Sequence, residues 1–179
     1  MNKIFIIISL LLLAFIGVVM RLVPHPANFT PVFAIALFAG FYLSKKWSLI
    51  LPLAIMLIGD FFIGFYDWKL MLVVYGSIAL AGLIGLATRN NRNIFTVATA
   101  TLLASIVFFL TTNLAVWYFS SWYSHDWTGL FQCYTLAVPF FKNSLLGDLF
   151  FVSLFFGGYE AIKMFVAQKV VLLSSVKSK

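Results

Sequence analysis

Charged residues are scarce in this chain of 179 residues: Asp, Glu, Lys and Arg together make up 9%, against 63% hydrophobic residues. A soluble domain carries about 25% charged and about 45–50% apolar residues. A chain so poor in charge would aggregate without lipid around it, which excludes a cytosolic enzyme and a nucleic-acid-binding domain. One cysteine, Cys133, permits no intrachain disulfide, which excludes a secreted disulfide scaffold. The composition therefore predicts a polytopic membrane protein.

Long apolar runs account for most of the length. Six spans of roughly 20 residues need about 120 residues, which leaves room only for short connections. The predicted spans cover residues 4–20, 28–43, 47–66, 70–88, 94–119 and 143–166. Residues 1–179 are therefore expected to form one all-α domain, an integral membrane bundle of six transmembrane helices. An interfacial helix around residues 130–138, ended by Pro139, is expected before the last span.

Acidic residues are also few, five against twelve Lys and Arg, and the resulting net charge is +7. The basic residues lie in the short connections and the tail, where they indicate orientation in the membrane. With six spans, one side holds nine of them: Lys3, Lys45, Lys46, Arg89, Arg92, Lys163, Lys169, Lys177 and Lys179. The other side holds Arg21, Lys69 and Lys142. This distribution predicts a multi-pass membrane protein with both termini cytoplasmic.

Most strongly polar groups within the spans are expected at one depth, near the outer face. An ionisable group inside a bilayer costs at least about 2.5–3.5 kcal/mol on insertion scales, so such groups are expected to pair or to line a pocket. The sequence therefore predicts a polar cavity open to the outside. The candidate substrate-binding residues are Arg21, His25, Asn28, Asp60, Asn113, Trp117, Asn143 and Asp148.

Two features of these candidates favour a binding role. Residues 21–31 contain three prolines, which give a stiff loop that can hold His25 and Asn28 over a cavity. Trp117 follows Asn113 by four residues and so shares its helix face. An aromatic ring beside an amide and carboxylates can stack on a flat ring or hold a cation.

Structural roles for the same residues remain open. Asp60 and Asp148 can form ion pairs with Arg21 and Lys142 that need no ligand. Asn113 can hold helices together by an interhelical hydrogen bond.

Capping is the other structural role. Asn143 is well placed as the N-cap of the last span. Thr30 is expected to cap the second span, with Pro31 at its first helical position.

Small residues recur every four positions in two spans. Ser77, Ala81 and Gly85 do so in the fourth span, and Ala36 and Gly40 in the second. Such faces allow helices to approach closely. We expect them to pack within this bundle, and docking of a partner subunit is the alternative.

No pattern in the sequence indicates chemistry. His25, His125 and Cys133 do not make a metal-ligand set, and no nucleophile–base pair or phosphate loop is present. We therefore expect no catalytic residue, no metal and no cofactor.

Several segments resemble a family of small bacterial membrane proteins. The family carries a domain-of-unknown-function label, and transport is the only function suggested for it. The segments are RLVPHPANFTPVFAIALFAG (21–40), Gly59–Asp60, TTNLAVW (111–117) and GLFQCYTLAVPFFKNSLLGDLFF (129–151). That family is similar to the substrate-capture S components of energy-coupling-factor (ECF) vitamin transporters. The resemblance implies a protein of the bacterial inner membrane with six helices, cytoplasmic termini and a ligand pocket at the outer face.

The resemblance also implies partners: an ECF-type transmembrane subunit and ATPases. S components typically dock through an Ala-x-x-x-Ala face on the first helix, and residues 4–20 have none. Our first hypothesis is capture of a small vitamin-like, cationic or heterocyclic solute for import. The alternative is a non-transporting membrane scaffold or assembly factor whose polar cluster is structural.

Overall fold

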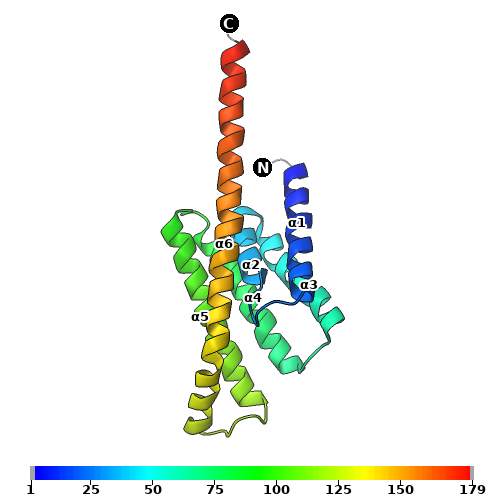
Figure 1. Cartoon of the computed structure of the whole chain (residues 1–179), viewed down its shortest axis with the longest axis vertical. Coiled ribbons are helices and arrows are strands. Elements are labelled where there is room, and N and C mark those ends of the chain that lie inside the picture. Colours follow the sequence, from blue (N-terminus) through cyan, green and yellow to red (C-terminus); the bar gives the residue numbers. More distant parts are fainter. Residues whose placement is uncertain (1–2, 178–179) are drawn as a thin grey trace.

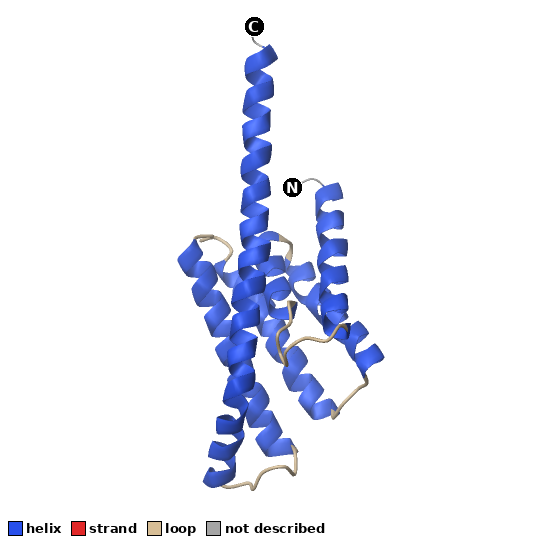
Figure 2. Ribbon diagram, in the orientation of Figure 1, coloured by secondary structure: helices blue, strands red, loops and turns tan. Residues whose placement is uncertain are grey.

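The computed structural model describes the backbone of residues 3–177 and the side chains of residues 7–168. Within these residues there are six helices and no strand (Figures 1 and 2). The helices are α1 (Lys3–Leu22), α2 (Val32–Tyr42), α3 (Lys45–Ile63), α4 (Trp68–Thr88), α5 (Ile94–Phe119) and α6 (Trp127–Lys177). Four of them, α3 to α6, are long and apolar enough to cross a membrane. The chain is therefore an all-helical membrane protein.

Helix α2 is the core of the bundle. Every one of its 11 residues is buried, and it contacts all five other helices. A helix that is apolar on all sides is stable either in lipid or among other helices, and α2 lies among other helices. This explains why α2 carries no charged residue although it is the shortest helix.

Glycines allow α2 and α4 to lie backbone to backbone. A Cβ at Gly40 would overlap the carbonyl oxygen of Gly82, and a Cβ at Gly85 would overlap that of Leu37. The small-residue faces predicted from the sequence therefore pack inside the bundle, and docking of a partner is not needed to explain them.

Both described ends of the chain lie at one end of the bundle (Figure 1). The α2–α3 and α4–α5 connections lie at this end too, so that Lys45, Lys46, Arg89 and Arg92 gather there. The α3–α4 and α5–α6 connections lie at the opposite end. The remaining lysines of the predicted basic side, except Lys163, fall outside the described side chains.

The connection between α1 and α2 is recessed from the end of the bundle (Figure 1). The cause is the length of α2, because 11 residues of helix rise only about 16 Å, half of a hydrocarbon layer of about 30 Å. From the sequence, the polar residues of this connection are expected near the outer face of the membrane. The second helix also begins at Val32 and not near Asn28, so the expected span of residues 28–43 is too long.

The expected cap of α2 is not formed. Pro31 occupies the N-cap position, and no side chain caps the helix. Pro31 suits this place because its missing N–H would have no helical partner there. Its carbonyl oxygen accepts the hydrogen bond of the Ile35 amide, at 2.8 Å.

The largest difference from expectation is α6, a single helix of 51 residues that runs through Pro139. The predicted interfacial helix at 130–138 and the separate start of the last span are therefore wrong. Asn143 lies within the helix and is not an N-cap. The N-terminal cap is Asp126, whose Oδ1 accepts the Gly129 amide at 2.7 Å. Proline is tolerated in apolar surroundings because ending the helix would leave further backbone groups without partners.

Candidate functional site

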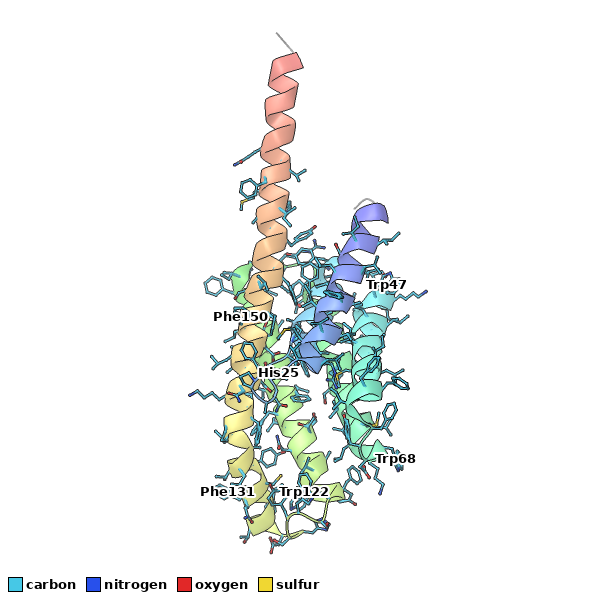
Figure 3. All side chains as sticks on the ribbon, turned by 45° about the vertical axis from the view of Figure 1, so that its right-hand side comes forward. His25, Trp47, Trp68, Trp122, Phe131 and Phe150 are labelled. Carbon is cyan, nitrogen blue, oxygen red and sulfur yellow. The ribbon has the colours of Figure 1, made fainter. Side chains whose placement is uncertain are left out.

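A cavity of about 300 Å³ lies beneath the recessed α1–α2 connection. Its polar wall consists of Arg21, His25, Asn28, Thr30, Tyr66, Ser144 and Asp148. Figure 3 shows His25 about half-way along the bundle, between the levels of Trp47 and Trp68. The cavity thus gathers polar groups from the end of α1, the loop after it and the middle of α6.

Arg21 and Asp60 form an ion pair that joins α1 to α3. Arg21 also donates a hydrogen bond from Nη1 to the Met56 sulfur, at 2.9 Å. The second carboxylate oxygen of Asp60 accepts the Tyr75 hydroxyl at 2.7 Å. Asp60 is 2% exposed, so its charge is compensated inside the protein. Of the two ion pairs that the sequence left open, this one is confirmed.

Gly59 makes room for this pair. A Cβ at Gly59 would overlap Nε of Arg21, so any larger residue would displace the guanidinium. Nε itself is buried and has no hydrogen-bond partner among the described residues. The Gly59–Asp60 dipeptide therefore supplies both the space for the arginine and its counter-charge.

Asp148 is the other buried carboxylate, 4% exposed, and it lines the cavity. Its Oδ2 accepts the Ser105 hydroxyl at 2.7 Å. Within the described part of the chain it has no cationic partner. Lys142, the partner allowed by the sequence, is exposed. Six residues of helix turn by about 600°, which places the two on different faces, so the second possible ion pair is not formed.

Aromatic rings form the apolar side of the cavity. Phe33 of α2 and Phe108 of α5 both line it, with ring centroids 4.8 Å apart in an edge-to-face arrangement. The other apolar residues of the lining are Val32, Met56, Ile63, Val74 and Ile78. The cavity therefore pairs one unbalanced carboxylate with an aromatic surface.

Asn113 lies in a smaller neighbouring cavity of about 190 Å³. Asn28, Phe108 and Ser144 line both cavities. The Asn113 side chain donates to the Phe109 carbonyl oxygen of its own helix, at 2.7 Å. The interhelical bond proposed for this side chain is not formed.

Three predicted site residues line neither cavity: Trp117, Asn143 and Asp60, the last of which is paired with Arg21. Trp117 donates from Nε1 to the Ser124 carbonyl oxygen at 2.9 Å, and its ring faces His125. It lies in the last turn of α5, beside the α5–α6 connection and near the end where Figure 3 shows Trp122 and Phe131. Asn143 is half-buried on α6 and lines neither cavity.

Sequence reasoning missed several residues of the site. Tyr75 and Ser105 hold the two carboxylates, and Phe33 and Phe108 form the aromatic wall. A tyrosine, a serine and two phenylalanines within apolar helices give no signal by themselves. Only the packing of the helices brings the first two to the carboxylates and the phenylalanines to the cavity.

The described side chains contain no group of three His, Cys, Asp or Glu placed to hold a metal ion. Fold and cavity together define an all-helical membrane protein with a polar cavity enclosed by its helices. The chain belongs to a family of unknown function, DUF6580, which it matches over residues 1–170. No curated protein and no solved structure matches it.

Proposed function

We propose that this protein binds a small solute with a cationic group in the cavity beneath the α1–α2 connection and captures it for import. The observation that carries the proposal is the Asp148 carboxylate, which is buried, lines the cavity and has no cationic partner among the described residues. A buried carboxylate without a counter-charge is strongly disfavoured. A cation in the cavity would supply the counter-charge that the described residues do not give Asp148.

The proposed roles of the site residues follow from their positions. Asp148 binds the cationic group, and Ser105 orients the carboxylate through its hydrogen bond. The rings of Phe33 and Phe108 contact the apolar or heterocyclic body of the solute. His25 and Asn28, on the loop above, donate or accept hydrogen bonds at its polar edge. Asp60 is already paired and takes no part in this recognition.

The proposed orientation has both termini in the cytoplasm. Nine of the twelve basic residues belong to the sequence segments of the termini and of the two connections at their end. The cavity, beneath a connection on the other side of the bundle, then receives its solute from outside. The proposed function includes no chemical step, and the energy for import would come from a separate subunit, as the ECF resemblance implies, or from an ion gradient.

Native mass spectrometry of the protein released gently from its own membrane tests this proposal. We expect a bound small molecule of defined mass, which is lost in Asp148→Asn. Asp126→Asn, which changes a carboxylate in the α5–α6 connection, is the matched control and should retain it. Loss of the molecule in both variants, or in neither, would remove the basis for Asp148 as its site.

A membrane scaffold is the second candidate, favoured by the complete internal pairing of Asp60. The two functions differ in a thermal-shift screen of amines, vitamins and nucleobases. A ligand at 100 times its Kd stabilises the protein by about 2.7 kcal/mol. For a solute-binding protein we expect such a response in the wild type and not in Asp148→Asn, whereas for a scaffold neither responds.

A further inference from the structure

Helix α6 continues far beyond the bundle. Figure 1 shows its C-terminal part, coloured orange to red, projecting past every other helix. Among the side chains described, which end at residue 168, Phe156 is the last buried one of this helix. The 21 residues from there to Lys177 correspond to about 30 Å of helix. This projection needs an explanation because the neighbouring helices cover none of its far part.

The projection is apolar where it is described. The exposed fractions of Ile162, Met164, Phe165 and Val166 are 55%, 62%, 71% and 58%. Apolar side chains in this number are not stable in water, so something covers them. If α6 stays straight, these side chains lie beyond the membrane. A membrane with its headgroups is about 40–45 Å thick, and about 30 residues of helix cross it. A helix that enters at Trp127 leaves near Gly157.

Gly157 and Gly158 stand at this point of exit. A Cβ at either position would meet no atom within 4 Å, so packing does not require glycine there. Glycine weakens a helix interior, and sharp bends occur at such pairs. Beyond the pair, Tyr159 and Glu160 contact Tyr42, through a ring contact with centroids 4.2 Å apart and a hydrogen bond of 3.0 Å. A bend at the glycine pair exchanges these two contacts for contacts with lipid.

The charge of the segment selects its partner. Residues 161–179 contain four lysines and no acidic residue. Ile162, Phe165 and Val166 have the spacing of an apolar helix face, which the sequence repeats at Leu172, Leu173 and Val176. Two copies packed along such a face would bring like charges together. An anionic lipid surface accepts the apolar face and attracts the lysines.

We propose that α6 bends at Gly157–Gly158 and that residues 161–177 lie as an amphipathic helix on the anionic lipid surface, at the end of the bundle where both described ends of the chain lie. The segment is a membrane-binding site separate from the solute cavity. The proposal for it does not depend on whether the cavity binds a solute. The segment fixes the end of the bundle to the headgroup region through lysines and apolar side chains.

The experiment uses the full chain in nanodiscs made with phosphatidylcholine alone or with added phosphatidylglycerol. Cys133, the single cysteine, is first replaced by Ser. A fluorescent label is then placed at Phe165→Cys or at Ala167→Cys, about 200° away around the helix. With phosphatidylglycerol, we expect lipids brominated in the acyl chain to quench the label at 165, while aqueous iodide quenches the label at 167.

Two further variants test the cause. Lys163 is paired with Glu160 at 3.1 Å, so the variant is made at Lys169, which has no acidic residue within four positions on either side. Lys169→Gln should lower the ratio of surface-bound to free segment about fivefold in discs with phosphatidylglycerol. Gly157→Ala/Gly158→Ala, which adds no clash, should stiffen the helix and weaken quenching of the 165 label by lipid. Equal access of iodide to both labels, protection that does not depend on phosphatidylglycerol, or energy transfer between two copies would each overturn the proposal.

Discussion

Replacement of Asp60 by Asn tests whether the Arg21–Asp60 pair holds α1 to the bundle. The variant keeps the shape of the side chain, and its amide can still meet the Tyr75 hydroxyl, but it removes the counter-charge of Arg21. The side chains are 13% and 3% exposed, so water does not replace the lost partner. Removal of one partner of a buried pair costs about 3–5 kcal/mol, and we expect a loss of this size in the free energy of unfolding.

The assay is unfolding by a denaturing detergent in mixed micelles, followed by circular dichroism. Tyr75→Phe is the control, since it removes one hydrogen bond to a charged group and should cost about 1.5–3 kcal/mol. Gly59→Ala should approach the loss of Asp60→Asn because its Cβ displaces the guanidinium. If Asp60→Asn costs less than about 1 kcal/mol, the value typical of exposed pairs, the pair does not fasten α1.

Two other perturbations follow from the structure. Gly85→Ala should destabilise the bundle by about 1–3 kcal/mol through overpacking against α2. Its control is Gly76→Ala, whose Cβ meets no atom within 4 Å and which should stabilise the bundle by up to about 1 kcal/mol. Equal effects of the two variants in the same detergent assay would refute the close α2–α4 contact. Hydrogen bonds from the Gly129 amide and the Ser124 hydroxyl lower the pKa of Asp126. The stabilising contribution of this cap is therefore complete above the usual carboxyl range and is lost as pH falls through the lowered pKa. Hydrogen exchange of the Gly129 amide should speed up at acidic pH in the wild type, and the same acid dependence in Asp126→Asn would contradict this assignment.

Composition and the pattern of apolar residues were sufficient to predict the helices and many of the residues that line the cavity. Residues 94–119 form a helix with the bounds expected from the sequence, because Asn93 and Ser120 end the apolar run on both sides. Arg21, His25, Asn28 and Asp148 do meet at one cavity. They could be predicted because polar groups in an apolar chain are few and must gather where they can be satisfied.

The remaining differences have physical causes that single residues do not reveal. Pro139 ends a helix in water but not in this apolar chain, so the continuity of α6 was missed. Lys142 and Asp148 are close in sequence but lie on different helix faces. The recessed position of the α1–α2 connection depends on the short length of α2, which the apolar run around it concealed.

The short, enclosed α2 also constrains how the protein is made. Eleven apolar residues are too few to cross a bilayer alone, so an insertion machinery cannot release this segment into lipid as an independent unit. It needs α3 and α4, which follow it and make most of its contacts with other helices. Biogenesis therefore requires that the first half of the chain be held together until α4 has emerged from the ribosome, and truncation before Thr88 should leave a product that quality-control proteases degrade.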